Sequence, residues 1–423
     1  MKYDVVVVGA GPVGSTAARY AALNGAKVLL IEEHASIGSP VGCTGLLSTR
    51  AVAECELKPA EDFVFNSVRG AFVYAPDGQC LPIDGKQTKA YVVSRKNFDR
   101  KLAEMAVDKG VDLSLKTRAI GLERKENPKS QIQGSSNSQV ELKVIKNGKE
   151  ETIETSVIIG ADGVKSRISS YAGLGKPARL LPGIQIEAPY ASEDSDFVEL
   201  FPGSCAPGFF AWTVPTGEKI SRIGLALEPE IISKNCKNLG TSGTISSPLS
   251  YLEKFLRSNS HVKARYSGGM LDFVVGGIPI GPAERTFSDG VLIVGDAAGQ
   301  AKPTSGGGVY TGAFAAKIAG KIAANAALEG DTSANRLSEY DFLWSKGLGK
   351  ELDIGMKIHD YMGKLEDKQL NELIGSFNNP SILKTITEYG DMDHPSVLVK
   401  KLMFSGNSLR LMKAFGTFLK TLF

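Results

Sequence analysis

The chain has 423 residues, of which 42% are hydrophobic and 22% charged, and its formal net charge is +3 at pH 7. These values are ordinary for a globular protein of two or three domains, and so small a net charge gives no reason to expect nucleic-acid binding. The five cysteines form no C-x-x-C pair and the four histidines form no ligand pair, so we expect a reducing cytoplasm and no metal site. We also expect no signal peptide and no membrane-spanning helix, because the chain enters an apolar strand at once and no apolar run is long enough to span.

The first elements predict a phosphate-binding unit. Residues 3–8 are rich in β-branched side chains and predict a buried parallel strand. Gly9, Gly11 and Gly14 follow in a G-x-G-x-x-G pattern, in which the first permits a tight turn, the second lets a pyrophosphate approach, and the third lets helix and strand pack closely. Residues 15–24 are Ala-rich and predict a helix whose N-terminus points at the phosphates.

A second strand completes this unit. Residues 27–31 are apolar, and Glu32 follows at the spacing where a carboxylate binds a ribose hydroxyl. Glu33 competes for this role, but Glu32 directly follows the apolar run and is preferred. Strand, glycine motif, helix, strand and acid occur in the order typical of a dinucleotide cradle.

The middle of the chain predicts further strands around a glycine-rich loop. Residues 35–48 contain the Gly and Pro typical of an extended segment, and residues 68–74 predict a strand. Asn147-Gly148 predicts a hairpin between two β-rich runs. The second of these ends in a G-A-D-G turn, where Asp162 is as consistent with closing the turn as with binding a cofactor, so it is not counted as a cofactor residue.

A second motif lies almost three hundred residues after the first. Residues 291–309, VLIVGDAAGQAKPTSGGGV, predict a strand that ends at Asp296, then a proline, a glycine triplet and a helix start. Asp296 could be a simple N-cap, although the flanking strand and glycines favour a cofactor contact. Together with the opening motif, this segment predicts FAD as the cofactor. Beyond Thr311 we expect a mostly helical chain.

These motifs resemble those of the p-hydroxybenzoate hydroxylase-type flavoproteins. Within that superfamily the chain is similar to the archaeal geranylgeranyl reductase family, which includes digeranylgeranylglycerophospholipid reductases. The similarity covers roughly three quarters of the chain and rests on six segments: GAGPVGS, SPVGCTG, SRKNFDRKLA, GADGVKSR, PGFFAWTVP and GDAAGQAKPTSGGGV.

The resemblance implies a role for each matching residue of the cofactor site. Those expected to contact FAD are Gly9, Gly11, Val13, Gly14, Glu32, Cys43, Thr44, Leu46, Arg95, Ala119, Asp296, Gly308 and Val309. Arg95 would neutralise a phosphate or hold the loop, or else be a solvated charge at a helix start. Cys43 is a candidate catalytic thiol that relays a proton or gates access, or a small residue where bulk would clash.

The resemblance also implies an isoprenoid ether-lipid substrate. Phe210 and Trp212 are two residues apart on one predicted strand, so their side chains lie on the same face. They would line an apolar cavity, or they would belong to the ordinary core. The family pattern here is Y-x-W-x-F-P, and this chain has Phe210 and Val214 in place of Tyr and Phe, which puts an acid role for the missing hydroxyl in doubt. Reduction would combine a hydride from flavin N5 with a proton. The two transfers would be closely concerted, because an isolated alkene accepts hydride poorly.

Three further questions stay open at this point. Residues 400–423 alternate basic and large apolar side chains, which fits a helix on the inner face of the cell membrane or one packed on the body. The electron donor would be ferredoxin or NAD(P)H. The alternatives to a lipid reductase are an FAD aromatic-ring monooxygenase and a prenyl-binding escort protein without enzyme activity.

The predicted architecture is α/β. It comprises a Rossmann-type FAD-binding domain (residues 1–60, 90–175 and 277–330), an inserted antiparallel-sheet substrate domain (residues 61–89 and 176–276) and a helical C-terminal region (residues 331–423).

Overall fold

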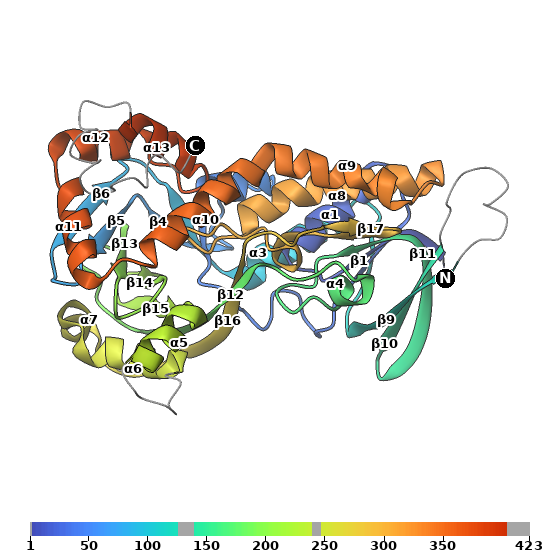
Figure 1. Ribbon diagram of the computed structural model, residues 1–423. Coiled ribbons are helices and arrows are strands. Elements are labelled where there is room, and N and C mark those ends of the chain that lie inside the picture. Colours follow the sequence, from blue (N-terminus) through green and yellow to red (C-terminus); the bar gives the residue numbers. More distant parts are fainter. Residues whose placement is uncertain (1, 126–138, 239–246, 404–423) are drawn as a thin grey trace.

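The computed structural model describes residues 2–125, 139–238 and 247–403. Figure 1 shows an elongated molecule with two lobes, one built on an eight-stranded sheet and the other on a seven-stranded sheet. The predicted fold class, an α/β chain with a cofactor domain and an inserted sheet, is confirmed.

The eight-stranded sheet has a parallel centre in the order β18–β11–β1–β2–β8. Val5, Val6 and Val7 of its middle strand are fully buried, as expected for a strand covered on both faces. The loop that follows this strand therefore opens at the carboxyl edge of the sheet, where ligands bind in such folds. The strands are β1 (Lys2–Val8), β2 (Val28–Ile31), β8 (Asp112–Ser114), β11 (Lys149–Gly160) and β18 (Val291–Ile293), and β17 (Phe287–Ser288) pairs with β18.

Small residues let two helices pack closely on this sheet. Helix α1 (Pro12–Leu23) contacts α8 (Val309–Glu329), where a side chain at Gly320 would stand 2.3 Å from the carbonyl oxygen of Ala17. The predicted first helix is confirmed, although it begins at Pro12, earlier than expected, because a proline suits the first helical turn. Helices α3 (Arg95–Val107) and α9 (Ala334–Trp344) complete this layer.

The predicted hairpin is also confirmed. Strands β10 (Gln139–Lys146) and β11 pair antiparallel about Asn147 and Gly148, both with positive φ. That geometry is the one that Asn-Gly favours in two-residue turns. Strand β9 (Thr117–Lys125) pairs with the other side of β10.

The seven-stranded sheet has the order β16–β12–β15–β14–β13–β5–β6, antiparallel except where β13 meets β5. Its outer face carries α5 (Pro229–Asn238), α6 (Pro248–Ser258) and α7 (Ser260–Arg265) over a core that includes Tyr190, Phe201 and Phe255. Its strands are β5 (Gly70–Tyr74), β6 (Cys80–Asp84), β12 (Arg179–Pro189), β13 (Phe197–Pro202), β14 (Phe210–Pro215), β15 (Ile220–Ala226) and β16 (Asp272–Ile280).

The prediction of a single strand over residues 68–74 was wrong at its start. The chain leaves β4 (Val64–Val68) at Arg69, whose backbone N–H donates to the carbonyl of Asp196 at 2.8 Å, and only then enters β5. Strand β4 instead pairs with β7 (Ala90–Val93), which also pairs with β3 (Leu46–Ser48) in a small third sheet. A run of apolar residues cannot reveal such a change of sheet.

Helices follow one another in the C-terminal part of the described chain, as predicted. After α9 come η3 (Ser345–Gly349), α10 (Lys350–Met362), α11 (Asp367–Phe377), α12 (Pro380–Tyr389) and α13 (Pro395–Met403). Figure 1 places α11–α13 along the lobe of the seven-stranded sheet. The domain boundaries given above stay a prediction.

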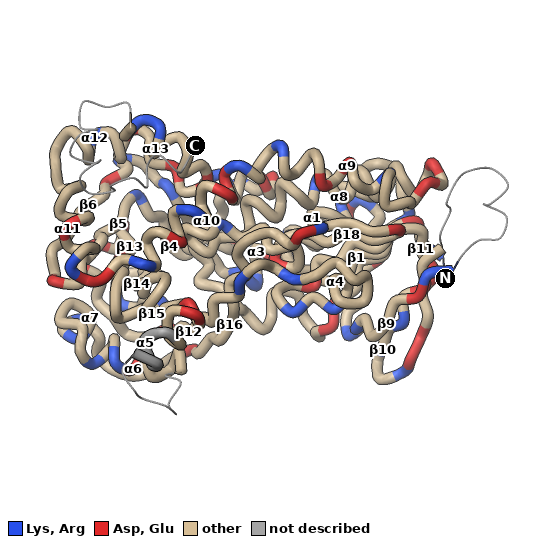
Figure 2. The backbone as a smooth tube through the Cα atoms, in the orientation of Figure 1, with Lys and Arg blue, Asp and Glu red and all other residues tan. Residues whose placement is uncertain are grey.

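Charges of both signs are interspersed over the described chain (Figure 2). Within the described ranges, none of the helices has the length and apolar character needed to cross a membrane.

Candidate active site

A cavity of about 930 Å³ lies where the two lobes meet, within the size range of ligand sites. At one end it is bounded by Gly11, Asp296 and Gly308 of the eight-stranded sheet lobe, and along its wall by Phe210 and Trp212 of the seven-stranded sheet. The predicted site residues that line it are Gly11, Val13, Cys43, Thr44, Leu46, Arg95, Phe210, Trp212, Asp296, Gly308 and Val309.

The glycine motif is shaped by contacts that exclude side chains. Gly9 has a φ of +100°, and a Cβ there would lie 2.4 Å from the carbonyl oxygen of Ala161. A Cβ on Gly14 would lie 1.8 Å from the carbonyl oxygen of Gly9. Gly11 differs, because nothing beyond its own local backbone lies within 4 Å of the place its Cβ would take. The open space beside Gly11, at the N-terminus of α1, fits a bound pyrophosphate.

Glu32 lies beside this loop. One carboxylate oxygen accepts the N–H of Ala10 at 3.0 Å, and the other accepts the N–H of His34 at 2.9 Å. Glu33 is exposed, which favours Glu32 for the ribose contact. Ala119 is buried in β9, where its carbonyl accepts from Arg167 at 3.4 Å. Gly9, Gly14, Glu32 and Ala119 are not among the residues that line the cavity.

Asp296 and Gly308 lie next to each other at the end of the cavity that Gly11 also bounds. Asp296 lies in η2 (Gly295–Ala298), and Gly308 is the N-cap of α8, where a Cβ would stand 2.8 Å from the Asp296 carboxylate. Burial raises the pKa of Asp296, while the charge of Arg95 opposes that rise. Among the described residues, none of the hydrogen bonds involves this carboxylate. A half-buried acceptor on the cavity wall, without a protein donor, fits a ligand that carries hydroxyl groups, as FAD does.

The loop that carries Cys43 is held by the second lobe. Cys43 Sγ accepts the N–H of Gly45 at 3.3 Å, and the Thr44 hydroxyl donates to Gln185 of β12 at 2.7 Å. Arg222 of β15 donates to the carbonyl of Thr44 at 2.6 Å. The predicted cofactor-contacting segment therefore depends on the seven-stranded sheet for its position.

Arg95 is enclosed, so the alternative of a solvated helix-start charge is wrong. Its guanidinium donates to both oxygens of Asp99, at 3.0 and 3.1 Å, and is 14% exposed. Burial works to lower the pKa of Arg95, but the side chains of Asp99 and Cys43 outweigh it and hold that pKa above its ordinary value. The cation beside Cys43 was not expected from the sequence.

The aromatic wall combines stacking with one polar contact. Phe210 stacks on Phe209 with ring centroids 4.2 Å apart and meets Trp212 edge-on at 6.0 Å. Trp212 Nε1 donates to Gln185 at 3.1 Å. Phe210 and Trp212 are both partly exposed and face the cavity, so they are available to a ligand; their role stays a prediction.

Asp162 has a structural role. Its carboxylate accepts the Ser166 hydroxyl at 2.6 Å and the backbone N–H groups of Arg167 and Ile168 at 2.7 and 3.1 Å, which stabilises the start of α4 (Arg167–Ala172). Its exclusion from the cofactor residues agrees with these contacts.

Sequence reasoning missed the residues that join the lobes. Gln185 and Arg222 come from strands without a recognisable motif, and Lys302 forms a buried ion pair with Asp393, far away in sequence. A single sequence carries no signal for such partners, because each pair forms only when distant elements meet.

Comparisons with known proteins show the family to which the chain belongs. Residues 4–163 match the family of FAD dependent oxidoreductases. A digeranylgeranylglycerophospholipid reductase of Methanothrix thermoacetophila is 35% identical, over 91% of this chain and 93% of that protein. Digeranylgeranylglycerophospholipid reductase 2 of Methanothermobacter thermautotrophicus is 34% identical, over 93% of this chain and 98% of that protein.

A solved structure extends the match. A geranylgeranyl bacteriochlorophyll reductase-like protein from Thermoplasma acidophilum superposes with a TM-score of 0.80 at 27% identity, over 95% of this chain and 98% of that one. With the glycine cradle and the Asp296 carboxylate on the cavity wall, the chain is an FAD-dependent oxidoreductase, which rules out the escort-protein alternative. This chain belongs to the archaeal geranylgeranyl reductase family.

Proposed function

We propose that this protein saturates carbon–carbon double bonds in the geranylgeranyl chains of digeranylgeranylglycerophospholipid, an archaeal ether lipid. The observation that carries the proposal is a single cavity that runs from the FAD end, at Gly11 and Asp296, to an apolar wall at Phe210 and Trp212. The names of the relatives support the same substrate class. Neither of these relatives is named as an aromatic-ring monooxygenase.

The cofactor end would hold FAD through backbone and carboxylate groups. The N-terminus of α1 at Gly11 would face the pyrophosphate, and Glu32 the adenosine ribose. Asp296 would accept a hydroxyl of the cofactor, and the N–H groups at Gly308 and Val309 would face the flavin pyrimidine. Bound in this position, reduced FAD supplies the hydride.

The remaining task of the protein is to exclude water, align the alkene and hold a proton. Phe210 and Trp212 would pack against the isoprenoid, and their faces would stabilise positive charge as it develops on the alkene carbon. Cys43 lies on the cavity wall beside Arg95 and is the candidate proton relay. Gln185 positions both Trp212 and Thr44, so it couples the aromatic wall to the loop that carries Cys43.

Mass spectrometry of the lipid tests the reaction. The chemically reduced protein is incubated without oxygen with an unsaturated archaeal ether phospholipid. We expect products heavier by one pair of hydrogens per saturated double bond, with no oxygen atom added. An unchanged lipid, or a hydroxylated product when oxygen is admitted, would contradict the proposal.

Two partners belong to the same proposal. The electron donor would be ferredoxin or NAD(P)H, and the protein would lie at the inner face of the cell membrane through residues 400–423, most of which fall outside the described residues. Helix α13 buries Leu402 beside Ile354 and Ile382, so a truncation that tests the tail should end after Met403.

We predict that removal of residues 404–423 weakens binding to anionic vesicles at low salt, since each Lys or Arg near the surface contributes about 1 kcal/mol. Vesicle flotation of both forms measures this. Equal flotation of the two forms would exclude the tail as the anchor.

A further inference from the structure

We propose that Lys89 binds the phosphate of the lipid headgroup at the end of the cavity away from the flavin. The proposal rests on the function proposed above and adds which group of the substrate is recognised, and by which side chain. Two observations support it: Lys89 lies on the cavity wall, and the other cations of that wall are paired with carboxylates whereas Lys89, among the described residues, is not.

The backbone of Lys89 is fixed at the start of β7. Its N–H donates to the carbonyl of Val68 at 2.8 Å, and its carbonyl accepts the N–H of Thr49 at 3.0 Å. The side chain is half-buried and lies against Gly85, where a Cβ would stand 2.5 Å from Lys89 Cε. Lys89, Gly85 and Thr88 all line the cavity, and Thr88 is exposed, so this turn forms part of the rim.

Lys89 differs from the other cations on the cavity wall. Arg50 pairs with Asp391, Arg95 with Asp99, and Lys302 with Asp393. In residues 2–125, 139–238 and 247–403, by contrast, no carboxylate lies within 4.0 Å of the Lys89 ammonium.

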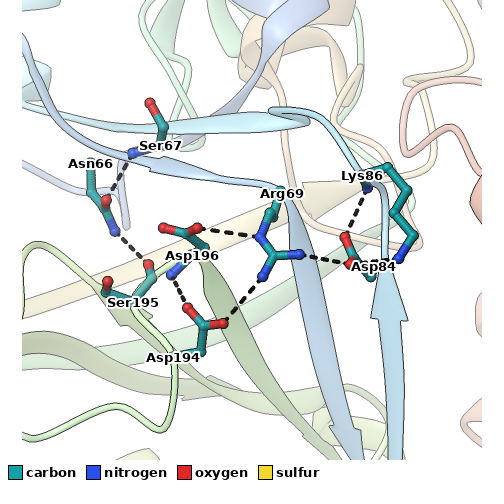
Figure 3. Close-up of polar contacts among 8 residues, drawn as sticks. All are labelled: Asn66, Ser67, Arg69, Asp84, Lys86, Asp194, Ser195 and Asp196. Atoms are coloured by element: carbon teal, nitrogen blue, oxygen red, sulfur yellow. Dashed lines mark hydrogen bonds and ion pairs between the residues drawn. The ribbon is translucent and has the colours of Figure 1, made fainter.

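The acidic residue nearest to Lys89 along the chain, Asp84, is already paired. Figure 3 shows Arg69 between three carboxylates, at 2.7 Å from Asp84, 3.2 Å from Asp196 and 3.4 Å from Asp194. Lys86 adds a second cation to Asp84 at 3.0 Å. Two cations, Arg69 and Lys86, thus face three carboxylates, which reduces but does not cancel the repulsion that the acids would exert on an incoming anion. Lys89 is the cation on this stretch of the cavity wall that is held by no carboxylate among the described residues.

The distance along β7 suits a lipid held at its headgroup. Val93, at the far end of the strand, donates to the carbonyl of Gly45, next to the loop that carries Cys43. Val93 is the fourth residue after Lys89, so along extended chain the two residues lie roughly 14 Å apart. An isoprenoid chain that begins at Lys89 would therefore run along the apolar wall toward the flavin end, with the Lys89 ammonium to match its phosphate.

The experiment compares two lipids that differ only in the phosphate: the phospholipid and neutral digeranylgeranylglycerol. The variants are Lys89→Gln and the matched control Lys86→Gln, on the same turn but paired with Asp84. We expect Lys89→Gln to raise KM for the phospholipid on the order of tenfold, since a hydrogen bond to a charged group is lost. KM for the neutral lipid should keep its wild-type value, Lys86→Gln should match the wild type on both lipids, and Lys89→Arg should restore phospholipid use.

Two outcomes would overturn this inference and leave the proposed function standing. An equal loss on both lipids would make Lys89 a packing residue, and no loss on either would remove it from the site. Inorganic phosphate separates a headgroup site from a free-phosphate site: it should compete with the phospholipid only, and equal inhibition of both lipids would contradict the proposal. A wild-type protein that saturates neither lipid would overturn the proposed function, and this inference with it.

Discussion

The two ends of the cavity are built in different ways. At the cofactor end, close backbone packing sets the shape: Gly9, Gly14 and the cavity-lining Gly308 are placed where a Cβ would meet a carbonyl or carboxylate oxygen at 2.8 Å or less. Along the lipid wall, side chains from separate strands form the surface, and Gln185 joins Thr44 to Trp212. The cofactor end should therefore fail abruptly when changed, whereas the lipid wall should respond in proportion to the atoms removed.

The largest effect should come from Gly14→Ala. Its Cβ would lie 1.8 Å from the carbonyl oxygen of Gly9, so backbone must move. We expect roughly 3 kcal/mol or more of lost stability together with loss of FAD, measured by thermal unfolding and flavin content. Gly11→Ala is the matched control, because its Cβ meets nothing beyond its own local backbone within 4 Å. It should fold normally and weaken only FAD binding, and equal unfolding temperatures for the two variants would contradict this reading of the motif.

The next effect is expected at Cys43. If its thiol relays the proton, Cys43→Ser should keep FAD and flavin reduction but slow alkene saturation by on the order of 100-fold, as for loss of a general acid. Rapid-reaction measurements of the two half-reactions would separate these steps. Near wild-type turnover in Cys43→Ala would leave this residue a space-filling role.

Trp212→Ala should have a smaller, graded effect. Loss of apolar contact at about 25 cal/mol per Å² predicts about 1–3 kcal/mol weaker lipid use and a changed number of saturated bonds, with the flavin spectrum unchanged. Trp212→Phe keeps a ring but loses the hydrogen bond to Gln185, so it separates packing from positioning. A product pattern unaltered in both variants would return Trp212 to the ordinary core.

An effect of similar size is expected at Asp296, which contributes a side chain rather than backbone to the cofactor end, and it should depend on pH. Asp296→Ala should cost about 1–3 kcal/mol of FAD affinity. A hydroxyl donor favours the ionised carboxylate, so FAD affinity should be full above the raised pKa of Asp296 and fall as the pH is lowered through it. Asp296→Asn should lack this fall, and the exposed Glu33→Ala should leave affinity unchanged. The same pH profile in wild type and Asp296→Asn would exclude Asp296 as its source.

The contrast between local backbone geometry and contacts from separate strands also explains what could be predicted from the sequence. Gly9, Gly14 and Glu32 follow from rules of backbone geometry that act within thirty residues, and Asn147-Gly148 fixes its hairpin for the same reason. The change of sheet at Arg69 depends on a bond to Asp196, which no local pattern encodes.

Long-range pairs were missed for the same physical reason. Arg222 reaches the carbonyl of Thr44, and Lys302 reaches Asp393, across the junction of the lobes. The pairing of Arg95 with Asp99 spans one helical turn and could have been found from its i, i+4 spacing, which would have argued against a solvated Arg95.

Anaerobic oxidation of the reduced flavin by the lipid tests the central claim most directly, namely that one cavity brings the flavin and the isoprenoid chain into contact. Protein with stoichiometrically reduced FAD and no other donor is mixed with the unsaturated phospholipid, and the flavin absorbance is followed. We predict that the absorbance of oxidised flavin returns, with one double bond saturated for each flavin oxidised. Flavin that stays reduced while the lipid remains bound would contradict the account.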